Sequence, residues 1–450
     1  MSKFHKPMSA FLPLIYVIAA ILLLILLILW VKLDTFISFL IVSIVLALAC
    51  NMSGPAIGLA ISNGIGSTLG SLVTILGFGA MLGKLVADSG AAQQITSSMV
   101  RIFGVRHIQW GMALAGLLVG IPMFYTAGFV IVVPLIFATG MSTRLPLLYI
   151  GIPMISALST AHGFLPPHPS PTAISQQLGA DIGKTLLYGL IISIPTIALA
   201  GPVFGRTLKK MNITPEQGLL NITFREEKDM PGLGISLATA LLPLILLTIT
   251  TALAPVMQEG SVLHRTVNFI GDPNIAMLLS VLVAIYFLGV RRGQPVKAVM
   301  KSIEQALKDI TPVMLIIAGA GVFMQVIKDG GINTYIGEAL KDLPVSPLVL
   351  GWLISAVIRV CVGSATVAGL TTVGILLPLI QQQVVHPELM VLSIGAGSLM
   401  FSHVNDGGFW LFKEYFNLSI KQTFATWSVM ETIVSVCGLL GVLVLEQFIG

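Results

Sequence analysis

The chain has 450 residues, of which 56% are hydrophobic and only 10% are charged. Soluble domains carry about 25% charged residues, so a water-soluble globule of this length is excluded. The net charge of +5 does not indicate nucleic-acid binding. The basic residues lie in short polar stretches between apolar runs, as they do beside an anionic membrane surface.

Apolar stretches follow one another along the chain and predict an all-α polytopic membrane protein. The first, 11–31, is long enough to cross a bilayer and too long for a typical signal peptide. Further spans are predicted at 35–50, 70–87, 145–161, 185–205, 234–256, 273–290, 311–328, 388–402 and 423–448. The stretches 108–140 and 347–380 are too long for one span and are interrupted by Pro or Gly, which predicts re-entrant hairpins.

Two polar, lysine- and arginine-rich stretches, 206–229 and 291–309, indicate the orientation. Two spans separate them, so they share one side, which the positive-inside rule makes the cytoplasm. The hairpin near 108–140 then opens to the cytoplasm and that near 347–380 to the outside. Apolar residues at spacings of three and four make 291–309 an amphipathic interfacial helix, with a solvated linker as the alternative. The side of the N-terminus stays open.

The two halves of the sequence match at an offset of 241 residues. The matches pair Asp88 with Asp329, 120–128 with 361–369, and His162 with His403. Because the two hairpins open to opposite faces, the repeats are predicted to be inverted, which is an architecture of secondary transporters.

This repeat divides the chain into three parts. Residues 1–205 form the N-terminal repeat, 206–233 a cytoplasmic linker, and 234–450 the C-terminal repeat. Each repeat is predicted to contain one hairpin and one broken helix, the latter near 162–172 and 403–408.

The hairpin tips are candidate anion sites. The first carries Tyr125 and Thr126, and the second carries Ser364 and Thr366 between two glycines. A helix that starts after such a turn offers unpaired backbone N–H groups to a carboxylate, and the hydroxyls can donate or accept. The alternative is that the small residues only allow close helix packing.

The first broken helix contains four prolines between residues 166 and 171, which forbid a continuous helix. His162, His168, Ser170 and Thr172 lie around this break. Because apolar spans flank it, we expect the break to line a cavity. Histidine titrates near neutral pH, so these side chains are candidates for substrate binding, and His162 also for proton transfer.

The second broken helix interrupts an apolar stretch at His403, Asn405 and Asp406. A carboxylate within a span is a functional hypothesis by default, which makes Asp406 the first candidate for proton coupling, followed by His403. Asn405 is a candidate hydrogen-bond partner of a polyol. The alternative is a surface turn. Arg359 in the second hairpin either attracts an anion or extends to the interface.

Other functional classes find little support. No Walker A loop is present, which argues against an ATP-driven pump. No close His/Cys/Glu spacing predicts a metal site, and neither a cofactor nor an enzymatic activity is expected. The three cysteines, Cys50, Cys361 and Cys437, lie in apolar runs and are predicted to be packing residues.

Three stretches make the chain similar to a known family. They are 162–169 (HGFLPPHP), 363–369 (GSATVAG) and 402–410 (SHVNDGGFW). With them the chain resembles the gluconate:proton symporter (GntP) family of the ion transporter superfamily over essentially its whole length. The pattern departs at Ser170, where the family usually has glycine.

The resemblance implies a bacterial inner-membrane importer of gluconate or a related hydroxy acid that is driven by the proton gradient. The superfamily implies paired hairpins, two broken helices and commonly a homodimer. A small anionic substrate, the proton and membrane lipid are the implied partners. Idonate, fructuronate or D-serine as the substrate, sodium coupling, and an anion channel stay open as alternatives.

Overall fold

The computed structural model describes residues 12–211, 213, 225–253, 256–332, 345–382, 385–404 and 406–449. Within these ranges the regular structure is helical and contains no strand. Six helical segments are long and apolar enough to cross a membrane, or up to eight if two bent pairs each count as one span. The predicted all-α polytopic membrane fold is therefore confirmed.

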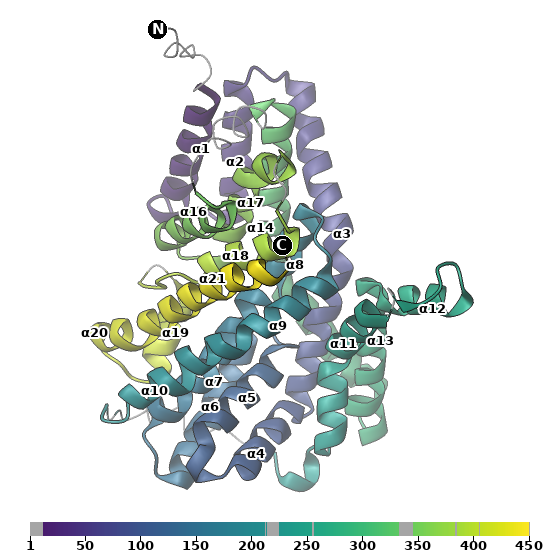
Figure 1. The fold of residues 1–450 in the computed structure, drawn as a ribbon, viewed down its shortest axis with the longest axis vertical. Coiled ribbons are helices and arrows are strands. Elements are labelled where there is room, and N and C mark those ends of the chain that lie inside the picture. Colours follow the sequence, from purple (N-terminus) through teal and green to yellow (C-terminus); the bar gives the residue numbers. More distant parts are fainter. Residues whose placement is uncertain are drawn as a thin grey trace.

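The N-terminal half forms a series of helices joined by short turns (Figure 1). Their bounds are α1 Leu12–Leu29, α2 Thr35–Ala49, α3 Gly54–Asp88, α4 Ala91–Phe103, α5 Ile108–Gly120, α6 Tyr125–Thr143, α7 Leu147–Phe164, α8 Pro169–Leu178, α9 Ile182–Ala198 and α10 Phe204–Thr207. Polar residues mark several of the starts. The Asp34 carboxylate, for example, accepts from the N–H groups of Phe36 and Ile37 at the start of α2.

The C-terminal half is also a series of helices. Its helices are α11 Leu233–Leu253, α12 Val262–Gly271, α13 Pro273–Ala284, α14 Val296–Asp329, α16 Pro347–Val362, α17 Ala365–Gln382, α18 Pro387–Gly397, α19 Gly407–Tyr415, α20 Ile420–Thr423 and α21 Val429–Ile449. A π-helical segment, η9 (Phe424–Ser428), leads directly into α21. Such segments occur frequently at functional sites.

Two helices are longer than the predicted spans. The glycine-rich 51–69 and the predicted span 70–87 together form α3, which bends by 45° between Gly70 and Leu72. Residues 296–309 continue without a break into the span of α14. The prediction of a separate interfacial helix at 291–309 is therefore wrong. Val299 of this segment is buried and lies against Gly289, whereas Val296 and Leu307 are exposed.

Both helical hairpins lie within the predicted stretches, and the two helix breaks, at 165–168 and 398–406, overlap the predicted ones at 162–172 and 403–408. α5 and α6 are joined by residues 121–124, and α16 and α17 by Gly363 and Ser364. Gly363 has a φ of 81°, a left-handed conformation that favours glycine. α7 ends at Phe164 before the prolines, and α18 ends at Gly397, well before α19 begins.

Equivalent elements recur at the predicted offset, although the inverted relation of the repeats stays a prediction. α3 and α14 start 242 residues apart, and they pack antiparallel along much of their length. Gly64 approaches Val322, while Asp88 at the other end of α3 accepts from the Ser302 hydroxyl. By their positions in the chain α5 corresponds to α16, α6 to α17, and α7 to α18. Corresponding helices of opposite direction are what an inverted repeat requires.

The two broken helices meet in the middle of the molecule, where α8, α18 and α21 lie close together (Figure 1). The backbones of α7 and α18 approach each other closely, which brings the two broken helices together. A Cβ atom at Gly395 of α18 would lie only 2.3 Å from the Gly163 carbonyl oxygen of α7. Small residues allow such approach between helices in a membrane, and the contact holds the two breaks beside one cavity.

Candidate functional site

A cavity of about 890 Å³ lies where the hairpin tips and the broken helices converge. Its polar lining comes from separate elements: Tyr125 (α6), Ser159 and His162 (α7), Arg359 (α16), Ser364 and Thr366 (second hairpin tip), Asp406 (before α19), and Trp427 and Glu431 (η9 and α21). Apolar residues such as Met123, Phe124 and Leu399 supply much of the remaining wall. A mainly apolar cavity with a few convergent polar groups is typical of a small-molecule site.

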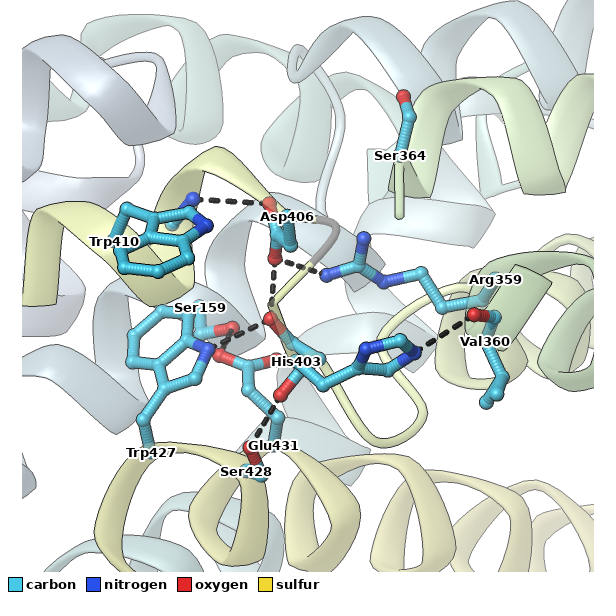
Figure 2. A network of polar contacts seen from close by, with 12 residues as sticks. Ser159, Arg359, Val360, Ser364, His403, Asp406, Trp410, Trp427, Ser428 and Glu431 are labelled. Atoms are coloured by element: carbon cyan, nitrogen blue, oxygen red, sulfur yellow. Dashed lines mark hydrogen bonds and ion pairs between the residues drawn. The ribbon is translucent and has the colours of Figure 1, made fainter. Parts of the chain in front are cut away.

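The strongest electrostatic feature of the cavity is an ion pair between Arg359 and Asp406 (Figure 2). Arg359 is only 4% exposed and Asp406 17%. Removing charges from water is costly unless they are paired and hydrogen-bonded. Arg359 therefore does not extend to the membrane interface, and its guanidinium is held inside the cavity by the Asp406 carboxylate.

Several donors position the Asp406 carboxylate. The Ser402 hydroxyl donates to one carboxylate oxygen, and the Gly408 N–H donates to the other at 2.9 Å. The second contact also caps the N-terminus of α19, where a negative charge is favoured. The segment before α19 therefore holds the Asp406 carboxylate within a defined set of donors.

The π-helical segment η9 supports this arrangement from the opposite side (Figure 2). The Trp427 indole N–H donates to the Ser402 hydroxyl at 2.7 Å, and the Ser428 hydroxyl donates to the Ser402 carbonyl. All three residues are buried. A chain of hydrogen bonds thus joins η9, through Ser402 and Asp406, to the guanidinium of Arg359.

Two hydrogen-bond donors of the Arg359 guanidinium are not used by the ion pair. Its Nε and Nη1 atoms are buried and have no hydrogen-bond partner among the residues that the structure describes. Buried polar groups are nearly always satisfied, and these guanidinium donors on a cavity wall are suited to bind an anion. Ser364 and Thr366, at the start of α17, line the same cavity. In Figure 2 the Ser364 hydroxyl points away from the ion pair, toward a different part of the site.

A second carboxyl group, Glu431, lines the cavity on α21 and is 1% exposed. Its Oε1 accepts from the Ser159 hydroxyl at 2.6 Å. Its Oε2 is buried without a hydrogen-bond partner within the described ranges, and Glu431 is absent from the ion pairs found there. The two buried carboxyl groups of the cavity therefore have different surroundings.

Of the three histidines predicted as site residues, one lines the cavity and two bind backbone carbonyls beside it. His162 lines the cavity, with its ring centroid 5.5 Å from Tyr125 and 5.4 Å from His168. The His168 Nε2–H donates to the Gly120 carbonyl at 2.9 Å, which ties the first break to the end of α5. The His403 Nε2–H donates to the Val360 carbonyl at 2.8 Å, one residue after Arg359. His168 and His403 therefore hold backbone segments in place.

The remaining predicted site residues lie away from the cavity or outside the description. Ser170 and Thr172 on α8 are buried, and neither is among the residues that line the cavity. The Ser170 hydroxyl lies against Gly369 of α17. Asn405 and the side chain of Thr126 lie outside the described residues.

The mouth of the cavity is charged. Lys84 Nζ and the Asp88 carboxylate form an ion pair at 2.8 Å between residues four apart on α3. Asp88 also accepts from the Ser302 hydroxyl of α14 at 2.7 Å, and the exposed Asp309 lies one turn from Ala306 on the cavity wall. These residues occupy the end of α3 and the first half of α14, beside the predicted cytoplasmic stretch.

Sequence reasoning did not identify Glu431, Trp427, Ser159 or Ser402 as site residues. The signal for Glu431 was available, since it is an acidic residue within the predicted span 423–448, and such residues are functional candidates by default. The other three are common residue types whose role depends on contacts between distant segments. No cluster of three or more His, Cys, Asp or Glu suited to a metal ion occurs in the described part of the chain.

A membrane-embedded cavity between broken helices, lined by an ion pair and hydroxyls, defines a membrane transporter. The chain matches the GntP family permease model over residues 12–449 and belongs to that family. It is a multi-pass protein of the inner membrane and a permease, not an enzyme.

Characterised relatives align over nearly the full length. The chain is 45% identical to the high-affinity gluconate transporter of Escherichia coli strain K12, covering 97% of this chain and all of the relative. It is 45% identical to the gluconate permease of Bacillus subtilis strain 168, covering 96% and 99%. Identity to the Escherichia coli Gnt-II system L-idonate transporter is 44%, covering 96% and 99%.

Solved structures show the same fold at much lower identity. The YdaH transporter of Alcanivorax borkumensis aligns with a TM-score of 0.69 at 15% identity, covering 92% of this chain and 98% of that chain. MtrF of Neisseria gonorrhoeae aligns with a TM-score of 0.58 at 13% identity, covering 86% and 84%. These similarities concern the fold alone.

Proposed function

We propose that this permease imports gluconate or a closely related sugar acid by proton symport. The names of the relatives support the substrate class, and the cavity supports an anion with several hydroxyls. The observation that carries the proposal is the buried Arg359 guanidinium, which is held by Asp406 and has donors unused among the described residues.

The substrate carboxylate is proposed to bind Arg359, whose planar guanidinium suits a carboxylate better than a lysine would. Hydroxyls of the sugar acid would meet Ser364, Thr366, Tyr125 and His162, all of which line the cavity. This changes the expectation from the sequence, in which backbone N–H groups took the carboxylate. Asp406 thereby becomes a positioning residue for Arg359, in addition to being a candidate for proton coupling.

The orientation of the cavity supports an inward-facing state. Its mouth lies beside Lys84, Asp88 and Asp309, at the end of the molecule that carries the predicted cytoplasmic stretches. Alternating access requires a second state in which the same site opens to the other face. The division into two repeats with a cytoplasmic linker, and a homodimer, remain predictions.

An uptake panel with reconstituted protein tests the function. Labelled gluconate should accumulate inside proteoliposomes when an inward proton gradient is imposed, and a protonophore should abolish the accumulation. Unlabelled idonate, fructuronate and D-serine compete in parallel to rank the substrates. Accumulation that depends on sodium and is unaffected by the proton gradient would contradict proton symport. An internal gluconate concentration that never exceeds its equilibrium value would indicate a channel.

L-Idonate is the second candidate substrate, because a relative named as an L-idonate transporter is almost as similar as those named for gluconate. The two sugar acids share a carboxylate and several hydroxyls. A lower half-maximal concentration for idonate than for gluconate in the competition assay would favour it.

A further inference from the structure

We infer that Glu431, rather than Asp406, carries the coupled proton in this transporter. The inference deepens the proposed function and rests on it. It starts from the different surroundings of the two buried carboxyl groups in the cavity. Asp406 is paired with Arg359 and accepts from Ser402 and Gly408. Glu431 has one neutral donor, the Ser159 hydroxyl, and a buried Oε2 without a partner among the described residues.

This difference determines which group can gain and lose a proton. An ionised carboxyl in a dry environment needs a cation and several donors. Asp406 has both, so protonating it would break an ion pair and leave the Arg359 charge uncompensated. Glu431 has neither a cation partner nor several donors. When water is excluded from the cavity around Glu431, the protonated form of its carboxyl group is therefore favoured. When water enters the cavity, solvation of Oε2 permits the proton to leave.

Other charged and titratable groups surround Glu431. Tyr125 of α6, His162 of α7, Arg359 of α16 and Asp406 line the same cavity. α9 and α18, which also pack on α21, carry Lys184, Tyr188 and Glu388, all within their first two turns. The cavity lining also includes Lys84, which is paired with Asp88, and Asp309. The charge of Arg359 is already opposed by Asp406.

The charge balance couples the proton to the substrate. With Arg359 positive and both acids ionised, the empty site carries one net negative charge. A substrate carboxylate adds a second, whereas a proton on Glu431 removes one. Binding of the anion and protonation of Glu431 therefore favour each other, and by linkage the coupling is reciprocal. The loaded carrier with its proton has the same net charge as the empty carrier without it, with one proton moved per anion.

Glu431→Gln tests the assignment, because the amide imitates the neutral carboxyl and cannot release a proton. Purified protein in weakly buffered solution is mixed with gluconate while a pH indicator reports proton uptake, and gluconate affinity is measured from pH 5 to 9. The wild type should take up protons on binding and lose affinity by up to about tenfold per pH unit at high pH. Glu431→Gln should bind gluconate without proton uptake and with affinity nearly independent of pH.

Transport supplies the second measurement. In proteoliposomes Glu431→Gln should exchange labelled for unlabelled gluconate but should not accumulate it when a proton gradient is imposed. The matched control is Glu446→Gln, the same change on the same helix about four turns away, which should behave like the wild type. Ser159→Ala removes the hydrogen bond to Glu431 and should shift the pH dependence without abolishing it.

The outcomes separate this inference from the proposed function. Wild-type protein that binds no gluconate, or takes up no proton on binding it, contradicts the proposed function itself. If the wild type couples and Glu431→Gln still takes up protons or accumulates gluconate, Glu431 is not the carrier. Failure of Glu431→Gln to bind gluconate at any pH also overturns the assignment, because the neutral form must be the binding form.

Discussion

At the scale of single residues, the central feature is the buried Arg359 guanidinium. Its position depends on Asp406, and Asp406 depends in turn on Ser402 and Trp427. Charge-assisted and bidentate hydrogen bonds are the strong ones in such a network. The cavity thus presents a fixed positive group to an anion without leaving a free charge in the membrane.

Arg359→Lys retains the positive charge but loses the planar fork of donors. We expect gluconate affinity to fall by about tenfold or more, since a hydrogen bond to a charged group contributes about 1.5–3 kcal/mol. Isothermal titration of the purified protein measures this change. Arg359→Gln should bind still more weakly and should also lower the melting temperature, because it leaves Asp406 unpaired. Unaltered affinity in Arg359→Lys would exclude a bidentate contact.

Trp427→Phe keeps an aromatic ring beside Tyr125 and removes the N–H that donates to the Ser402 hydroxyl. One hydrogen bond contributes about 1 kcal/mol, which corresponds to about a fivefold change in an equilibrium constant. We expect the half-maximal gluconate concentration for uptake to rise by this amount, with little change in melting temperature. Trp410→Phe is the control, since the Trp410 indole donates to the Val404 carbonyl and Trp410 does not line the cavity.

At the scale of elements, the site depends on two broken helices that pack at close range. α7 and α18 approach where Gly163 faces Gly395, and each helix ends shortly afterwards. Prolines end the first helix, and the second ends before the segment that carries Asp406. The π-helical segment η9 then directs Trp427 and Ser428 toward this break.

Gly395→Ala should destabilise the packing of these helices, because the added methyl would meet the Gly163 carbonyl oxygen at 2.3 Å. Overpacking of this kind costs about 1–3 kcal/mol. A lowered melting temperature in detergent, with reduced uptake, would show it. Gly234→Ala on α11 is the control, as a Cβ there meets nothing within 4 Å. Equal melting temperatures for the two variants would contradict the packing argument.

At the scale of the whole molecule, α14 connects the two faces of the protein. Asp309 lies near the cavity mouth, and Lys328 lies near the opposite end of the helix. A separation of 19 residues in a helix is about 29 Å, which is close to the thickness of the hydrocarbon core. The proposed inward-facing state opens the site only toward the end that carries Asp309.

Single cysteines test this orientation in a background where Cys50, Cys361 and Cys437 are replaced by serine. A membrane-impermeant thiol reagent should label Asp309→Cys in inside-out vesicles and Lys328→Cys in intact cells. Gluconate should slow labelling of Asp309→Cys, because the bound anion promotes closure of the cavity. Labelling of both positions from one side would contradict the orientation.

Most of the apolar helices, the two helical hairpins and the two helix breaks could be predicted from the sequence, because each depends on local chemistry. Runs of apolar residues need a bilayer, prolines between 166 and 171 stop a helix, and Gly363 permits a left-handed turn. The family motifs follow the same breaks. Asp406 was also a candidate site residue from the sequence, since an acidic residue inside an apolar stretch is rare without a function.

The contacts that these residues make with one another depend on how the helices pack. Arg359, Asp406, Ser402, Trp427 and Glu431 belong to separate segments, and their partners cannot be inferred from sequence spacing. The structure assigned His168 and His403 to backbone carbonyls and paired Asp406 with Arg359. It placed Glu431 beside Ser159, 272 residues away along the chain. The free energy of a buried charge depends on all its neighbours in space, and those neighbours are defined only when the helices have packed.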